Sequence, residues 1–444
     1  MCGDGTLPLV HISIDSRTMA GQDLFVPLIG EKVDAHRFIA QAFAAGAAAV
    51  LTSEHDQMED EHPWIRVEDT KKALQDIGRY YRARLSLLLV GITGSVGKTT
   101  TREMIAAALS AGYRVYKTPG NHNSQVGVPI TLSEITSEDE IGVLELGMSM
   151  PGELTVIAGI AMVDMAVITN VGVTHIEQLG SQENIYREKL TIQDGLKDGG
   201  ILFLNGDDPR LKETKAKAGC RTVYYGTGDN SGYRAEDIRI EDGYPVFTAV
   251  HGAVRIPVRL RVMGRHNVLN AMVALAVADA SHVPMEQAAK ALEAFSGFKN
   301  RQQIYERNGI TVIDDTYNAS PVSMKAGLEV LLSMKKAVRR IAVLADMKEL
   351  GPDSAKFHRE IGTWLAEHPV DLLFTLGDLA GEIETGVREG AKVPECRHFA
   401  GDDREGLYQA LVQVLREGDC VLLKGSNSMK LGEVASRLTA ENNR

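Results

Sequence analysis

The sequence has few cysteines and no cysteine pairs. Four cysteines stand far apart among 444 residues, and no two of them form a C-x-x-C motif. This spacing favours neither a disulfide framework nor a zinc site, and it is typical of a reducing compartment. We therefore expect unreactive thiols in a cytoplasmic protein.

An excess of positive charge is also absent. The chain has 48 lysines and arginines against 59 aspartates and glutamates, which gives a formal net charge of -11. Such a chain repels a polyphosphate backbone on average, and we find no basic patch that would offset this repulsion. We expect no binding to nucleic acid.

Long apolar runs and targeting segments are missing too. The most apolar windows, 85–92 and 38–51, are shorter than the roughly 20 residues that span a bilayer. The N-terminal sequence MCGDGTLPLV lacks the basic region and apolar core of a signal peptide. These features predict a cytoplasmic protein without membrane insertion.

What the sequence does contain is the composition of a large globular protein. It is 44% hydrophobic and 24% charged, and at roughly 100 to 200 residues per domain its length suggests two to four domains. Neither a low-complexity linker nor a repeat of fixed period marks the boundaries. We place them by the segments that carry function, at 1–84, 85–298 and 299–444.

From residue 86 onward, short apolar segments typical of strands alternate with segments of helical pattern. The eight strand segments are LLLVGI, VLELG, AVITNVG, ILFLNGD, ITVIDD, IAVLAD, DLLFTLG and CVLLKG. Their nearly continuous apolarity predicts parallel sheets with helices on both faces. We therefore expect most of the chain to be α/β.

The strongest single motif is a glycine-rich loop between a predicted strand and a predicted helix. The segment LLLVGI-TGSVGKTT-TREMIAAALS has the order of a phosphate-binding P-loop, shortened to G-x-x-G-K-T because Ile92 stands where the longer pattern has glycine. Loop N–H groups and the helix N-terminus favour phosphate, Lys98 can neutralise the β- and γ-phosphates, and the Thr99 hydroxyl suits Mg2+. The predicted ATP-binding residues here are Gly94, Ser95, Val96, Gly97, Lys98, Thr99 and Thr100.

Polar side chains follow two of the later strand segments. Glu145 lies in VLELG and His175 follows AVITNVGVT, at the carboxyl ends of strands, where α/β sheets bind their ligands. Glu145 is a reasonable magnesium ligand, with a helix-capping role as the alternative. His175 could equally be a hydrogen-bonded loop histidine, because imidazole is not the preferred ligand of magnesium.

Five further residues gain meaning only from their joint pattern. Lys189, taken alone, is typical of a surface lysine on a helix that leads away from the phosphate site. Asn267 and Asn270 lie three residues apart on one predicted helix face, and Arg301 and Asp315 follow later. None of these indicates a function by itself.

Taken in chain order, these motifs resemble the Mur ligase family, the ATP-dependent amino-acid and peptide ligases of bacterial cell-wall precursor synthesis. The matching segments are T-G-x-x-G-K-T-T at 93–100, E-L-G at 145–147, T-N-(x)3-T-H at 169–175, G-x-H-N-x-x-N at 264–270, N-R at 300–301 and DDTYNASP at 314–321. The resemblance runs over essentially the whole chain. It implies a small N-terminal α/β domain that binds a UDP substrate, a central P-loop ATPase-like parallel-sheet domain and a C-terminal Rossmann-like α/β domain.

Within the family, four segments favour one activity. DSR at 15–17, GNHNSQVGVP at 120–129, DDTYNASP and ADMKELG resemble enzymes that join D-alanyl-D-alanine to UDP-N-acetylmuramoyl-tripeptide. The resemblance implies an amide-forming ligase that uses ATP and Mg2+, passes through an acyl phosphate, and closes its domains around its ligands. We also expect a monomer.

The resemblance assigns roles residue by residue. It implies catalytic roles for Lys98, Glu145, His175 and Lys189. Its metal ligands would be Thr99, Glu145, His175 and Lys189, the lysine as a carbamate that resembles a carboxylate. Further ATP-binding residues would be Asn267, Asn270, Arg301, Asp315 and Asn318. The UDP substrate would be held by Asp15, Ser16, Arg17, Asn121 and Asn123.

Alternative functions remain open from the sequence. A sister cell-wall ligase or a folylpolyglutamate synthetase would share the central domain, whereas a P-loop switch or transport ATPase would couple hydrolysis to a change of shape. A non-catalytic nucleotide-binding module is a further alternative. The sequence identifies neither the third residue of the tripeptide, lysine or diaminopimelate, nor the base that deprotonates the incoming amine.

Overall fold

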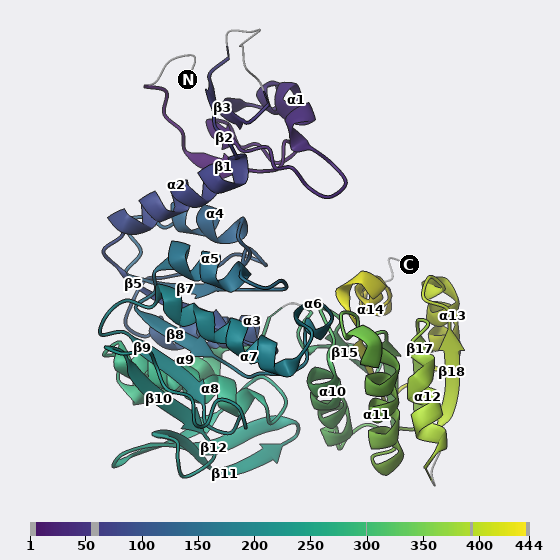
Figure 1. The fold of residues 1–444 in the computed structure, drawn as a ribbon. Helices are drawn as coiled ribbons and strands as arrows, with labels where there is room; N and C mark the ends of the chain where they lie inside the picture. The colour runs from purple at the N-terminus through teal and green to yellow at the C-terminus, as the bar shows by residue number, and fades with distance from the viewer. Residues whose placement is uncertain (1–5, 55–61, 299, 391–393, 441–444) are drawn as a thin grey trace.

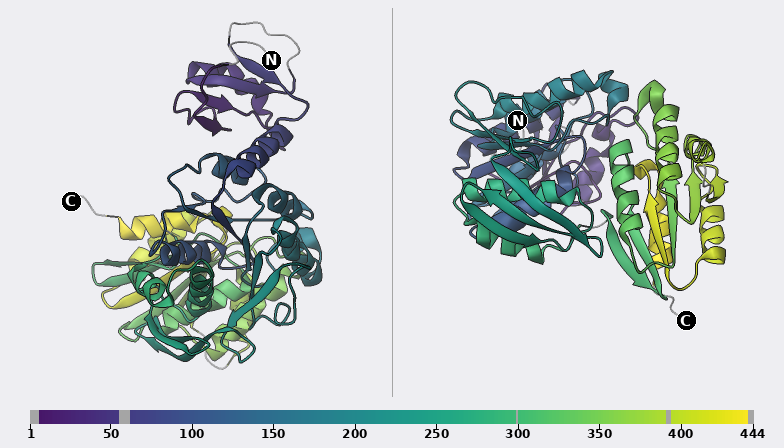
Figure 2. Two further views of the ribbon diagram at one scale, coloured as in Figure 1. Left: turned by 90° about the vertical axis from the view of Figure 1, so that its left-hand side faces the viewer. Right: turned by 90° about the horizontal axis from the view of Figure 1, so that it is seen from below.

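The computed structural model describes residues 6–54, 62–298, 300–390 and 394–440, which form three α/β units, each with its own sheet (Figure 1). The small N-terminal unit stands apart at one end, while the central and C-terminal units lie side by side (Figures 1 and 2). The expected three-domain α/β fold is confirmed. Among the described residues, none of the helices has both the length and the apolarity needed to cross a bilayer.

The N-terminal sheet has four short parallel strands in the order β1-β2-β3-β4. Its elements are β1 (His11–Ser13), β2 (Asp23–Phe25), η1 (Ala35–Phe38), α1 (Ile39–Ala44), β3 (Ala47–Thr52), β4 (Trp64–Arg66) and α2 (Thr70–Arg84). Helix α2 begins where the Asp69 carboxylate accepts the Lys72 N–H, 2.9 Å away. It packs on α4 (Gly127–Ser133) and α5 (Glu153–Ala161) of the central unit and so joins the two units.

The central sheet has nine strands in the order β13-β12-β11-β10-β9-β8-β5-β7-β6. Its strands are β5 (Leu88–Thr93), β6 (Val115–Lys117), β7 (Ile141–Glu145), β8 (Met165–Ile168), β9 (Ile201–Asn205), β10 (Arg221–Gly226), β11 (Tyr233–Glu241), β12 (Tyr244–His251) and β13 (Val254–Arg259). The strands from β6 to β11 pair in parallel, whereas β12 and β13 add an antiparallel edge.

Helices cover both faces of this sheet. They are α3 (Lys98–Leu109), α4 (Gly127–Ser133), α5 (Glu153–Ala161), α6 (Ile176–Leu179), α7 (Gln182–Leu190), η2 (Thr191–Gly195), α8 (Asn267–Ala280) and α9 (Met285–Ala294). One hydrophobic cluster packs α3, α8 and α9 on one face, and a second packs α5 and α7 on the other. Since both faces are covered, strands such as β7 are buried along their whole length, which explains their continuous apolarity.

The C-terminal sheet has six strands in the order β14-β15-β19-β16-β17-β18, with only β14 antiparallel. Its strands are β14 (Gln303–Arg307), β15 (Ile310–Asp315), β16 (Arg339–Ala345), β17 (Leu372–Leu376), β18 (Glu395–Phe399) and β19 (Asp419–Lys424). Its helices are α10 (Pro321–Ser333), η3 (Gly351–Asp353), α11 (Ser354–Glu367), α12 (Gly381–Arg388), α13 (Arg404–Val414), η4 (Asn427–Met429) and α14 (Leu431–Thr439). Clusters on the two faces form its core.

Candidate active site

The phosphate loop has the predicted strand, loop and helix context. Strand β5 ends at Thr93 and α3 begins at Lys98. Gly94 adopts a φ of +151°, and a Cβ there would lie 1.8 Å from the Thr169 hydroxyl oxygen, so only glycine fits. The N-cap residue of α3 is Gly97, which makes no side-chain hydrogen bond to the N–H groups of the first turn. The first N–H groups of α3 therefore lack a side-chain acceptor, as a phosphate-binding helix N-terminus requires.

Glu145 lies beside this loop because β5 and β7 are neighbours, with Ile92 in register with Glu145. One carboxylate oxygen accepts the Thr99 hydroxyl at 3.0 Å, and the other accepts the Asn123 amide at 2.8 Å. The side chain is only 3% exposed. The structure thus brings together Thr99 and Glu145, which were predicted to bind metal, and places Asn123, which was predicted to bind the UDP substrate, beside them.

Two lysines, the partly buried Lys98 and the buried Lys189, lie at or near the same loop. Burial lowers the pKa of Lys98, whose ammonium donates to the Gly94 carbonyl at 2.8 Å. Lys189 is 2% exposed, and burial, followed by repulsion from Lys98, lowers its pKa well below the usual range. Lys189 is therefore not a surface lysine, and its surroundings disfavour the charged form of its amine.

Helix α8 contributes the two predicted asparagines. The Asn270 amide donates to the Asn267 side-chain oxygen at 2.9 Å, and the Thr101 hydroxyl donates to Asn270 at 3.0 Å. The Asn267 amide in turn donates to the Met263 carbonyl at 2.6 Å. These bonds fix both side chains and tie α8 to the P-loop helix α3.

The C-terminal unit reaches the loop through Arg301. Its guanidinium donates to the Thr99 hydroxyl oxygen at 3.0 Å and lies 3.9 Å from the centre of the Tyr317 ring, a cation–π contact. The neighbouring residues Asn300 and Gln302 have positive φ angles, 58° and 52°. This strained segment, directly after the central unit, holds Arg301 against the P-loop.

His175 lies where the central and C-terminal units meet. It is the N-cap of α6, with a φ of 66°, and its Nδ1 forms an ion pair with the Glu349 carboxylate. The hydrogen bond with His175 lowers the pKa of Glu349. The structure therefore gives this histidine a partner from the C-terminal unit, whereas the sequence had suggested either a metal ligand or a hydrogen-bonded loop histidine.

A cavity of about 1260 Å³ joins these groups between the central and C-terminal units. Most of the predicted site residues line it, namely Ser95, Val96, Gly97, Lys98, Thr99, Thr100, Asn123, Glu145, His175, Asn267, Asn270, Arg301, Asp315 and Asn318. Gly94, Lys189 and Asn121 are not among the lining residues. Its size falls at the upper end of small-molecule sites, enough for a nucleotide and a further ligand.

Three of the predicted UDP-binding residues, Asp15, Ser16 and Arg17, lie in the N-terminal unit and do not line this cavity, whereas Asn121 and Asn123 belong to the central unit and Asn123 lines the cavity. Arg17 is largely exposed and donates from Nε and Nη2 to the two carboxylate oxygens of Asp15, at 2.8 and 2.7 Å. This contact lowers the pKa of Asp15 to about 2. Ser16 between them is buried. The three residues form a fixed, polar turn after β1.

Three residues of the central and C-terminal units lie at the site but were not predicted from the sequence. Arg102 is 1% exposed, donates to the Gly120 carbonyl at 3.0 Å and lies 3.4 Å from the Glu145 carboxylate. Its position three residues after Thr99 on the same helix could have indicated that it lies near the site.

Lys424, buried at the end of β19, donates to Asp315 at 2.6 Å. The pKa of the buried His266 falls to about 4 because of burial, and this ring also lines the cavity.

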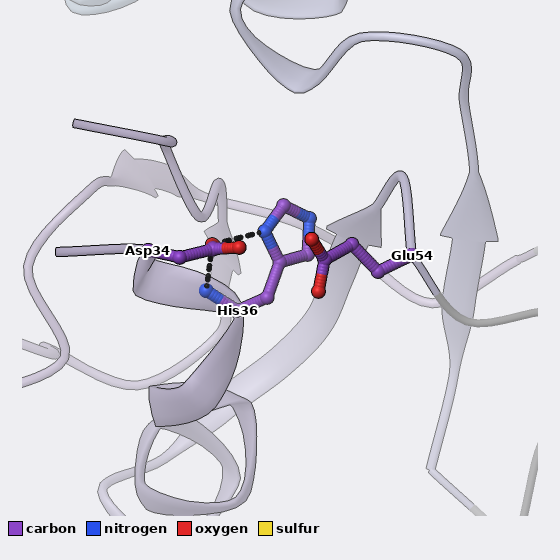
Figure 3. A group of neighbouring side chains, drawn as sticks. All are labelled: Asp34, His36 and Glu54. Atoms are coloured by element: carbon purple, nitrogen blue, oxygen red, sulfur yellow. Dashed lines mark hydrogen bonds and ion pairs between the residues drawn. The ribbon is translucent and has the colours of Figure 1, made fainter. Parts of the chain in front are cut away.

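A cluster of Asp34, His36 and Glu54 in the N-terminal unit has the spacing of a metal site (Figure 3). The ring nitrogen Nδ1 of His36 lies 2.7 Å from the Asp34 carboxylate, and Nε2 accepts the Ser53 N–H at 3.0 Å. Both ring nitrogens are therefore used within the protein, and no lone pair is left for a metal. This histidine is structural.

Comparison with known proteins identifies the class first. Residues 8–82 match the model of the Mur ligase family, catalytic domain, residues 92–278 match the Mur ligase middle domain, and residues 300–427 match the Mur ligase, glutamate ligase domain. The chain belongs to the Mur ligase family. This membership excludes the P-loop switch and the transport ATPase.

Several relatives that share one name are similar to this chain over nearly its whole length. A UDP-N-acetylmuramoyl-tripeptide--D-alanyl-D-alanine ligase of Bacillus subtilis is 38% identical over 97% of this chain and 93% of its own. A crystal structure of MurF from Acinetobacter baumannii superposes with a TM-score of 0.88 at 30% identity, covering 97% of this chain and 93% of that one. MurF ligase from Thermotoga maritima in complex with ADP gives 0.84 at 28% identity, covering 97% of each chain.

Proposed function

We propose that this protein is an ADP-forming ligase that joins D-alanyl-D-alanine to UDP-N-acetylmuramoyl-tripeptide in peptidoglycan precursor synthesis. The observation that carries the proposal is the Thr99–Glu145 pair beside the P-loop, in a cavity walled by two units. The name of the Bacillus subtilis relative, whose similarity spans nearly the whole of both chains, supports the choice of substrates.

We assign nucleotide binding to the cavity, with the ADP complex of the Thermotoga maritima relative in support. Residues 94–100 would hold the phosphates, and Lys98 would neutralise their charge. From α8, Asn267 and Asn270 would face the adenine and ribose. From the C-terminal unit, Arg301, Asp315 and Asn318 would contact the nucleotide. Lys424 would hold the Asp315 carboxylate in place, since the two are paired 2.6 Å apart.

The donor groups beside the loop fit a magnesium ion. The Thr99 hydroxyl and the Glu145 carboxylate are hard oxygen ligands whose oxygens lie 3.0 Å apart. A carbamate on Lys189 would add further oxygen ligands, and His175 would complete the set. When bound, the ion would screen the negative charge that gathers on the phosphates during the reaction.

The chemistry requires activation because a carboxylate has no good leaving group. An oxygen of the tripeptide carboxylate attacks the γ-phosphorus of ATP, ADP leaves, and an acyl phosphate forms. The dipeptide amine then attacks the acyl carbon, phosphate leaves, and the nitrogen loses a proton. Lys98 and the α3 N-terminus stabilise the charge in both steps, and the closed units exclude the water that would hydrolyse the acyl phosphate.

We expect the three units to bind different ligands. We place them at 1–84, 85–298 and 299–444, since each segment contains one sheet. Asp15, Ser16, Arg17, Asn121 and Asn123 would hold the UDP substrate, and the C-terminal unit would bind the dipeptide. We further propose that the protein is cytoplasmic, because its cysteines are few and far apart in the sequence, and that it is a monomer.

Oxygen-18 in the tripeptide carboxylate tests this reaction route. We expect the released phosphate to carry one labelled oxygen, because the attacking carboxylate oxygen leaves with the phosphorus when the amine displaces it. Mass spectrometry of the phosphate measures the label. Phosphate without label, formed together with the ligated product, would contradict the acyl phosphate.

The depressed pKa of Lys189 predicts carbamylation. Because burial lowers the pKa of Lys189 well below its usual range, the neutral amine is more favoured than in an ordinary lysine, and the neutral form is the one that reacts with carbon dioxide; protonation removes the carbamate as the pH falls. With carbon-13 bicarbonate we expect a carbamate resonance in the NMR spectrum that Lys189→Met abolishes. Lys197→Met, at a partly exposed lysine paired with Asp164, should retain it. A signal that survives Lys189→Met would contradict the assignment.

A further inference from the structure

The segment of the central unit around α6 lies against the loop of the C-terminal unit that follows β16. Figure 1 shows α6 beside the C-terminal unit. Val173 packs on the hydrophobic core of the C-terminal unit, which includes Met347 and Leu350. The Glu177 N–H donates to the Glu349 carbonyl at 3.4 Å, and α6 also packs on η3. The contact between His175 and Glu349 is therefore part of a continuous interface between the units.

Both partners of this contact have unusual backbones. The φ angle is 66° at His175 and 64° at Glu349, in the left-handed region that histidine and glutamate rarely adopt. Such conformations persist where the surroundings determine them, and they cluster at functional sites. The Glu349 side chain is 47% exposed, so the contact adds little to any hydrophobic core.

A carboxylate on one ring nitrogen determines what the other nitrogen can do. When the neutral ring has its proton on Nδ1, the nitrogen in contact with the Glu349 carboxylate, the lone pair of His175 is on Nε2. Metal-binding histidines usually have this arrangement, in which an outer carboxylate fixes the tautomer and the ring orientation. Here the histidine lines the cavity from the central unit, while the carboxylate belongs to the C-terminal unit.

We propose that Glu349 is a positioning residue, through which the C-terminal unit orients His175 so that the magnesium environment is complete only when the two units are together. This inference rests on the proposed function, which supplies the magnesium. It explains how approach of the C-terminal unit could prepare the metal site as well as exclude water.

The test is calorimetric titration of ADP into the full-length protein, with and without Mg2+. In the wild type we expect Mg2+ to tighten ADP binding. In Glu349→Ala this tightening should fall by about tenfold or more, with metal-free ADP binding unchanged. Glu349→Gln, whose amide oxygen can still accept Nδ1–H, should fall in between. Glu405→Gln, which removes a distant carboxylate paired with Arg437 in the same unit, should match the wild type.

A double mutant separates positioning from other roles. His175→Ala should lose the same factor, and adding Glu349→Ala to it should cause no further loss, because the glutamate acts through the histidine. Wild-type tightening in Glu349→Ala, or fully additive losses, would overturn the inference and leave the proposed function intact. An altered KM for the dipeptide with unchanged tightening would also overturn it, in favour of substrate contact. Failure of the wild type to bind ADP would instead overturn the proposed function.

Discussion

Lys98→Met is expected to lower kcat by about 100- to 1,000-fold, because it removes a preorganised positive charge from the phosphate loop. Since burial lowers the pKa of Lys98, the charged ammonium is not favoured by its surroundings. The melting temperature should therefore stay the same or rise, as for other residues kept for activity at the expense of stability. Phosphate release and thermal unfolding measure the two effects.

The matched control for this prediction is Lys197→Met. Lys197 belongs to the same unit, and its ammonium pairs with Asp164 at 3.0 Å outside the cavity. We expect wild-type kcat for this control. A kcat within threefold of wild type in Lys98→Met would mean that this lysine does not stabilise the reacting phosphates.

Glu145→Gln is expected to lower kcat by about 100-fold or more and to raise the Mg2+ concentration that gives half the maximal rate. Glutamine keeps the volume of the side chain and can still bond to Thr99 and Asn123, so the fold should be retained. What it loses is the negative charge that a magnesium ligand needs. Rates measured across a series of Mg2+ concentrations test this.

Glu134→Gln is the control for this substitution. Glu134 lies in the same unit and accepts the Tyr116 hydroxyl at 2.6 Å, away from the cavity. Its Mg2+ dependence should match that of the wild type. Equal rates for Glu145→Gln and wild type at every Mg2+ concentration would remove Glu145 from the metal site.

The sequence predicted the parallel parts of the fold well. All eight predicted strand segments contain a strand, and the P-loop lies between β5 and α3 as expected. These strands are continuous apolar runs because helices bury both faces of the sheets. The proposed domain boundaries stay predictions.

The antiparallel edge of the central sheet was not predicted. Strands β11 to β13 alternate between buried and less buried residues, so they contain no apolar run. Asp242 and Gly243, with φ angles of 50° and 88°, form the turn between β11 and β12. An Asp-Gly pair between alternating segments is a hairpin signal that was present in the sequence.

The site was only partly predictable, for a physical reason. Asn267 and Asn270 are three residues apart on a helix, and their spacing alone places them on one face. His175 and Glu349, in contrast, meet only because two units pack together. The burial of Lys189 likewise depends on how α7 packs against the sheet, which one helix pattern does not determine.

The central claim is that this chain couples ATP to the joining of a dipeptide to a UDP-muramoyl tripeptide. Phosphate release from ATP, measured with the tripeptide substrate in the presence and absence of D-alanyl-D-alanine, tests it most directly. We predict sustained release only when both substrates are present, in equal amounts with the ligated product. Release that is equally fast without the dipeptide, or no release with it, would contradict the claim.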